Sequence, residues 1–181
     1  MKLAAALVLA FAPAWAQLAK PVVASSAAGA PRVPRISLAT LAFLDKAFDT
    51  RLTSYNLNDP IDLLGATRGL YLDGYGVVFT TEVSLIVTPG ISPFHQTISE
   101  AEKALVYQRK VARVPVLIQL MSDMVKSSAQ QLSSLPDNEQ VVLAVKLLYL
   151  PWEKTDGLPG MIVMKASRRA AVTGQIQTES Q

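Results

Sequence analysis

Cysteine is absent from this chain of 181 residues. Its absence excludes disulfide bonds, thiolate metal sites and the attachment of a lipid to an N-terminal cysteine. Histidine is almost as scarce, because His95 is the single one. Half of the residues are hydrophobic and only 17% are charged. A folded domain of this composition has to be stabilised by its apolar core.

An excess of charge of one sign is also lacking, since 17 basic and 14 acidic side chains give a net charge of +3 at neutral pH. The densest basic groups are residues 109–113 and Arg168-Arg169. Neither is the extended basic surface that nucleic-acid binding requires. We therefore expect no nucleic-acid partner.

Motifs of catalysis and cofactor binding are missing as well. The sequence contains no Gly-x-Ser-x-Gly, Ser-x-x-Lys or His-Glu-x-x-His, no glycine loop for phosphate and no calcium loop. We therefore predict no catalytic residue, no metal and no cofactor.

Residues 1–16 have the three parts of a secretory signal peptide. Lys2 precedes an apolar run of about ten residues, and Ala14-Trp15-Ala16 is a small-x-small cleavage site. The run stops at Pro13, well short of the about 20 residues that span a bilayer, so an uncleaved anchor is the weaker alternative. The sequence predicts an exported mature chain that begins at Gln17, is periplasmic or secreted, and has no membrane span.

The rest of the chain is predicted to form one domain over residues 36–172, between a flexible leader at 17–35 and a disordered tail at 173–181. The leader is rich in small residues and proline, and the tail is polar. Apolar residues at intervals of three and four predict a helix over 37–54, with Ser37 as its cap.

Two strand pairs are predicted. Asp73-Gly74 is typical of a tight hairpin turn, here between strands at 69–72 and 75–87. On the second strand Val77, Phe79, Val83, Leu85 and Val87 share one face. The second pair comprises 139–150 and 161–172, where Ile162, Met164 and Ala166 point inward.

Between the pairs, capping-box patterns at Thr97–Glu102 begin a long helix whose apolar residues repeat every seven positions from Ala104 to Leu132. The repeat passes through Pro115, which predicts two segments bent near 111–115, with a clean break as the alternative. We predict an α+β fold in the order α-ββ-α-ββ, a four-stranded antiparallel sheet covered by this helix. Use of the seven-residue stripe as a homodimer seam is the alternative.

Four side chains are candidates for binding. His95 lies in a loop before the long helix, where it is either a general base or metal ligand or simply an exposed side chain. If Asp73-Gly74 is a two-residue turn, Arg68 lies opposite Phe79 on the apolar side of the hairpin. There it needs an ion pair or an anion, unless its head reaches water at the strand end.

Tyr149 and Trp152 complete the set, in a loop that contains Pro151 and Pro159. A tryptophan between prolines is a rigid apolar anchor for a partner, or a plug over the core. Four acidic residues were also considered as a carboxylate pair, and turn or solvated positions fit them better. They are Asp59, Asp62, Asp73 and Glu82.

Export without a catalytic motif indicates a bacterial envelope protein that is a non-catalytic binding or structural module. Its expected partner is an envelope protein, a peptide or a polymer. Two alternatives remain open at this point. One is a periplasmic protein that binds a small apolar ligand between the long helix and the sheet, near Met121 and Met124. The other is a hydrolase that uses His95.

Overall fold

The computed structural model describes residues 36–88 and 97–181. The predicted signal peptide, the leader and His95 lie outside the described residues. Each of the two long helices precedes a pair of strands, and a short helix precedes the last strand. The elements are α1 (Leu38–Ser54), β1 (Asp62–Leu72), β2 (Gly76–Ser84), α2 (Glu100–Gln131), β3 (Gln140–Leu147), β4 (Met161–Ser167), α3 (Arg168–Val172) and β5 (Gln177–Ser180).

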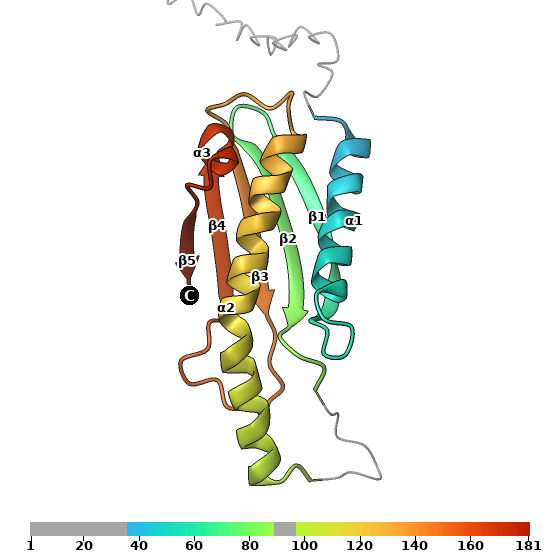
Figure 1. Ribbon diagram of the computed structural model, residues 1–181, viewed down its shortest axis with the longest axis vertical. Coiled ribbons are helices and arrows are strands. Elements are labelled where there is room, and N and C mark those ends of the chain that lie inside the picture. The colour runs from blue at the N-terminus through green and yellow to red at the C-terminus, as the bar shows by residue number, and fades with distance from the viewer. Residues whose placement is uncertain (1–35, 89–96) are drawn as a thin grey trace, which may run out of the picture. The chain divides into compact units, whose positions relative to one another are not determined.

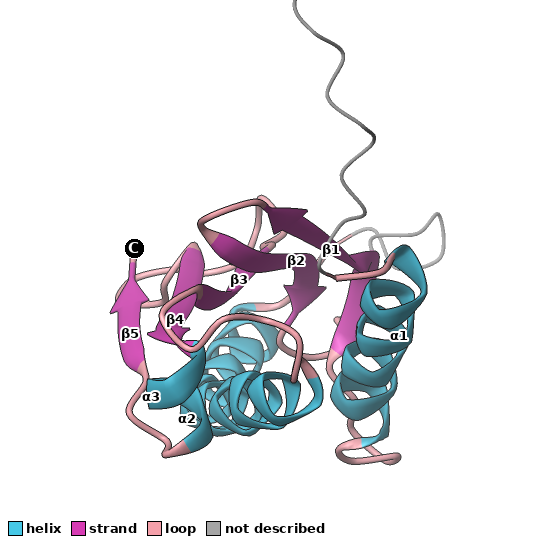
Figure 2. Ribbon diagram, turned by 90° about the horizontal axis from the view of Figure 1, so that it is seen from above, coloured by secondary structure: helices cyan, strands magenta, loops and turns pink. Residues whose placement is uncertain are grey.

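The predicted α+β class is confirmed. The five described strands form one sheet in the order β1-β2-β3-β4-β5, and the described helices lie on one side of it (Figures 1 and 2). The core lies between the two layers. Phe48 of α1 meets Phe79 of β2 edge to face, with ring centroids 4.8 Å apart, and both side chains are buried.

The prediction of a four-stranded sheet that is antiparallel throughout is wrong at the contact between β2 and β3. β2 and β3 are parallel, with Val77 beside Val141 and Val83 beside Leu147, while the outer pairs are antiparallel. The physical reason is the connection, because α2 returns the chain to the end of the sheet where β2 began. A strand that follows such a crossover helix runs in the same direction as the strand before it.

Both long helices begin where the sequence predicted. The Ser37 side chain accepts a hydrogen bond from the backbone N–H of Thr40 at 3.1 Å. Ser99 and Glu102 form the reciprocal capping box of α2. However, α2 continues as one helix through Pro115, so the alternative of a clean break is wrong, while the bend near residues 111–115 stays a prediction. Pro115 lies on the exposed side of the helix, where water can hydrate the carbonyl that its ring leaves unpaired.

The first hairpin has a different register from the predicted one. Three residues, 73–75, connect Leu72 to its partner Gly76, so Arg68 lies opposite Thr80 and not opposite Phe79. A shift of one residue moves a side chain to the other face of a sheet. Arg68 is therefore exposed on the face away from the helices, and its predicted place on the apolar side is wrong.

The C-terminal end is more ordered than predicted. Residues 168–172 form α3 and not the end of a strand, and residues 177–180 form β5 and not a disordered tail. Backbone bonds between Met161 and Gln181 close this edge, with the N–H of Gln181 donating to the carbonyl of Met161 at 3.0 Å. The inward set of β4 is confirmed, since Ile162, Met164 and Ala166 are buried.

The opposite edge of the sheet is protected by carboxylates of α1. One oxygen of Asp49, Oδ1, accepts hydrogen bonds from the backbone N–H of Thr67 at 2.9 Å and from its hydroxyl at 2.6 Å. Asp45, one turn earlier, lies against Gly69. Side chains that occupy the free N–H groups of an edge strand prevent further strands from pairing there. β1 is therefore a blocked edge.

Gly76 is the position where the two halves of the sheet approach each other most closely. Its φ is +135°, and a Cβ atom there would lie 2.0 Å from the carbonyl oxygen of Gln140 on β3. We expect Gly76→Ala to lower the free energy of unfolding by at least about 3 kcal/mol, because strain and a backbone clash add. Gly74→Ala is the matched control, since Gly74 has a φ of +79° and open space around it.

Urea unfolding monitored by circular dichroism measures both variants. The control should lose only about 1 kcal/mol. Equal losses for the two variants would mean that the approach of β2 to β3 imposes no constraint beyond the φ angle.

The edge carboxylates give a pH prediction. Burial raises the pKa of Asp45 above its ordinary value of 3.8, although the N–H of Gly69 opposes the shift. A raised carboxyl pKa means that ionisation destabilises the fold, and this cost appears as the pH rises above about 3.8. We therefore expect Asp45→Asn to gain stability relative to the natural chain between pH 3 and pH 7.

Asp49→Asn is the contrasting variant and should lose about 1 kcal/mol at pH 7, because it weakens two charge-assisted hydrogen bonds. Unfolding free energies measured over this pH range test the pair. A pH-independent difference between Asp45→Asn and the natural chain would contradict the burial of an ionised Asp45.

Candidate functional site

A hollow of about 460 Å³ lies on the surface beside the carboxyl ends of β2 and β3. Strand ends of parallel pairs are where loops diverge and leave room for a ligand. Three leucines line the hollow, together with one carboxylate and three residues that carry hydroxyl groups. The lining residues are Asp62, Leu64, Ser84, Thr88, Leu148, Tyr149 and Leu150.

One wall of the hollow belongs to the loop after β3, residues 148–160, which is fixed at several points. The hydroxyl of Tyr149 donates to the carbonyl of Pro159 at 2.7 Å, within the loop. The hydroxyl of Tyr107 on α2 donates to the carbonyl of Asp156 at 2.8 Å. The loop is thus held against the N-terminal half of α2, as its position in Figure 1 shows.

The strongest fixation point is a buried ion pair. Lys110 Nζ lies 2.5 Å from Glu153 Oε2, and the two side chains are 0% and 1% exposed. Nζ also lies 3.3 Å from Ser84 Oγ and 5.0 Å from the centre of the Tyr149 ring. Since a charge taken out of water needs all of its partners, each of these contacts holds the loop in one place. The second oxygen of Glu153, Oε1, is buried without a partner among the described residues.

Ser84 beside a lysine resembles the pair used by some hydrolases, but the hydrogen bonds oppose that role. Its hydroxyl donates to the carbonyl of Ile86 at 2.9 Å. The ammonium group of Lys110 faces Glu153 and is the donor toward Ser84. A lysine that donates to both groups in this way is not placed to accept the proton of a nucleophile. The arrangement is structural.

Tyr149 is a hydrogen-bond donor at neutral pH. Burial, together with the negative charge of Glu153, raises the pKa of Tyr149 to about 12. Its phenol therefore stays protonated throughout the physiological range, and it serves as a positioned O–H group and an apolar surface.

The cations of the basic segment of α2 are paired within the fold. Asp59 accepts from Arg109 at 2.7 Å and also pairs with Arg113, whose guanidinium lies over the ring of Tyr55. Lys110, between them in sequence, pairs with Glu153.

Sequence analysis missed Lys110, Arg113, Glu153 and the pairing of Asp59. The spacing of these residues could have indicated that they are buried. Lys110 and Arg113 fall between Val106 and Leu117 at intervals of three and four, which places all four on one face of the helix. The predicted stripe passed instead through Val111, which is 44% exposed. Charged side chains were assumed to be solvated, and that assumption hid the buried positions.

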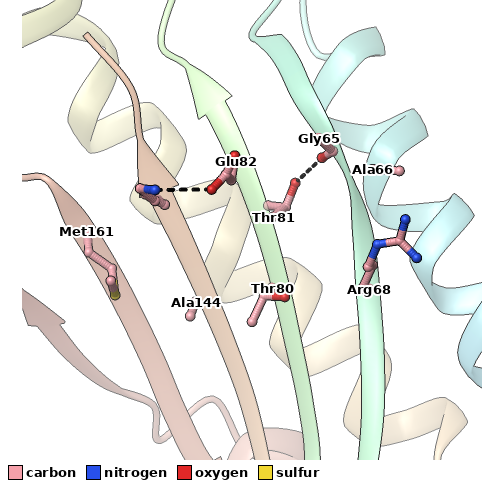
Figure 3. Close-up of a pocket in the computed structure, with 9 residues that line it drawn as sticks. Gly65, Ala66, Arg68, Thr80, Thr81, Glu82, Ala144 and Met161 are labelled. Carbon is pink, nitrogen blue, oxygen red and sulfur yellow. Dashed lines mark hydrogen bonds and ion pairs between the residues drawn. The ribbon is translucent and has the colours of Figure 1, made fainter.

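The structure separates Arg68 from Tyr149 and Trp152. Tyr149 and Trp152 lie in the same fixed loop, and Trp152 is half-buried. Arg68 lines a second hollow, of about 430 Å³, in the middle of the face that the described helices leave uncovered. Figure 3 shows the Arg68 guanidinium turned away from Glu82, which pairs with Lys146 at 3.2 Å. His95 lies outside the described residues.

Residues 36–88 and 97–181 hold no group of three or more side chains suited to a metal ion. In the same residues, no helix has the length and apolar character needed to cross a bilayer.

Comparison of the chain with protein-family models, with curated proteins and with solved structures finds no match. The inference of function therefore starts from the chemistry of the residues themselves.

Because Lys110 and Glu153 form a buried ion pair, we expect a single variant of this pair to be much less stable than the double variant. Lys110→Met leaves Glu153 buried and unpaired, so the free energy of unfolding should fall by about 3–5 kcal/mol. The double variant Lys110→Met/Glu153→Leu removes both charges and should recover most of that loss. Denaturant unfolding of the two variants gives the comparison.

Lys103→Met is the control, because Lys103 pairs with Glu100 at the exposed start of the same helix. It should leave stability unchanged. If the double variant is as unstable as Lys110→Met, the loss comes from packing of the lysine stem and not from the unpaired carboxylate.

Proposed function

We propose that this chain is an exported protein of the bacterial envelope whose role is binding, without catalysis. The binding surface is the loop 148–160 together with the hollow beside it. The partner is a protein, a peptide or a polymer. Export rests on residues 1–16, with Lys2, the apolar run and Ala14-Trp15-Ala16.

The observation that supports this role best is the fixation of the loop by the buried Lys110–Glu153 pair. When a mobile loop binds a partner, the entropy lost on ordering the loop lowers the affinity. A loop that is already fixed avoids this loss. The loop presents Trp152, half-buried, and Leu150, which is 39% exposed. Aromatic side chains on a rigid support are typical of the residues that dominate binding energy.

The lining of the hollow indicates what kind of segment fits. Leu64, Leu148 and Leu150 supply apolar walls, and Asp62 is the one carboxylate of the lining. The hollow therefore suits an apolar side chain with a hydrogen-bond donor or cation beside it, as a peptide or protein segment provides.

The alternative of a small apolar ligand between helix and sheet receives no support from the packing. The side chains that meet there, among them Leu117, Met121, Met124 and Leu143, are buried in one continuous core. The hollow beside the loop lies at the surface instead.

A photo-crosslinking amino acid tests the binding surface in cells. At Leu150, 39% exposed, it should form adducts with one envelope component; at Val172, 36% exposed at the other end of the sheet, it should form none. Trp152→Ala should reduce the Leu150 adduct about tenfold without changing the free energy of unfolding. The adducts are quantified from the periplasmic fraction.

Three results would contradict the proposal. One is an equal adduct yield from both positions, and another is an adduct that Trp152→Ala leaves unchanged. The third is recovery of the full-length chain, still beginning at Met1, from the cytoplasmic fraction, which would contradict export.

A further inference from the structure

The face of the sheet away from the described helices has a composition unlike that of a solvated surface. In β1, every second side chain from Leu64 to Leu72 is exposed, and Leu64, Leu70 and Leu72 are 50%, 58% and 42% exposed. Antiparallel strands with one solvated face normally carry polar residues at these positions. Several large apolar side chains on one face mark an interaction surface. We refer to the face that includes Leu70, Val78 and Val142 as the open face.

One row across the open face has opposite charges at its two ends. The strand registers place Arg68 beside Thr80, Thr80 beside Ala144, Ala144 beside Val163, and Val163 beside Glu179. The row therefore begins with a cation on β1, crosses small and apolar side chains, and ends with a carboxylate on β5. Among the described residues Arg68 makes no ion pair within 4.0 Å, and its charge acts on the more distant carboxylate of Asp45 on α1. The neighbouring row begins with Leu70, Val78 and Val142, which are apolar.

From this row we propose that a second copy of the chain packs face to face on the open face. Most protein homodimers have a two-fold axis, which brings the same patch of both subunits together. An axis parallel to the strands and passing over β3 places β1 of one subunit over β5 of the other. Arg68 then faces Glu179 of the second copy, and Glu179 faces the second Arg68. Ala144 lies near the axis, where its small side chain permits two sheets to approach to about 10 Å.

The charge and size of the open face favour a second copy over a partner of strong charge. Its lysines are already paired across strands, with Lys146 at 3.2 Å from Glu82 and Lys165 at 2.5 Å from Glu179, so Glu179 meets the second copy's Arg68 beside Lys165. The face thus has no field of one sign. Five strands about 4.8 Å apart and about seven residues long cover about 550 Å² before side-chain relief. A standard interface buries about 800 Å² per partner, which is of the same order.

The proposal is tested by the mass of the purified chain in analytical ultracentrifugation. The natural chain should sediment as a dimer. Arg68→Glu and Glu179→Arg should each be monomeric, because each places like charges opposite one another twice. An equimolar mixture of the two variants should recover the dimer mass, because every opposed pair in the mixed dimer then has opposite charges. A natural chain that is monomeric at about 100 µM would overturn the proposal, and so would a mixture that stays monomeric.

A second pair of variants separates the open face from general effects of added charge. Leu70→Glu on the open face and Leu105→Glu on the outer side of α2 alter side chains that are 58% and 56% exposed. We expect Leu70→Glu to raise the dissociation constant of the dimer at least tenfold. The circular dichroism spectrum should be the same as that of the natural chain. Leu105→Glu should leave the dimer intact. Dissociation by Leu105→Glu alone would assign the interface to α2 and overturn the proposal.

Discussion

The parallel pairing of β2 with β3 is the constraint on which the rest of this structure depends. Each of the outer strand pairs is a local antiparallel arrangement, and only the contact between β2 and β3 joins them into one sheet. That contact is possible because α2 carries the chain back along the sheet, and because Gly76 lets the backbone of β2 approach Gln140. As β2 and β3 run in the same direction, their carboxyl ends meet at one end of the sheet, where the hollow lies.

The length of α2 explains why the other elements at this end are held by charges. A helix of 32 residues is about 48 Å long, whereas β2, with nine residues, spans about 30 Å. The N-terminal turns of α2 therefore extend beyond the sheet, as Figure 1 shows. Among the described residues no strand covers that overhang, and the loops after α1 and β3 lie there instead. They supply Asp59 and Glu153, which pair with cations of the helix.

Features that depend on neighbouring residues could be predicted from the sequence, and features that depend on distant contacts could not. Ser37, the capping box at Ser99 and the inward set of β4 follow from local hydrogen bonding and strict alternation. The hairpin turn was located correctly, but one extra residue in the turn moved Arg68 to the opposite face. Tyr149 and Trp152 could be assigned to one loop. The contact of Tyr149 with Lys110 could not, because the two residues are far apart in sequence and lysine was assumed to be solvated.

The two faces of the sheet differ because the described helices cover only one of them. α1 and α2 together bury the inner side chains from Val77 to Met164, and the carboxylates of α1 block the β1 edge. The open face is left with leucines along β1 and with cross-strand ion pairs that offset most of its charge. An exposed face of this kind costs free energy in water, since leucine is poorly solvated. A second copy that packs on the open face buries these leucines and recovers that free energy. No further element of the chain is needed, and this is the physical basis for self-association through the open face.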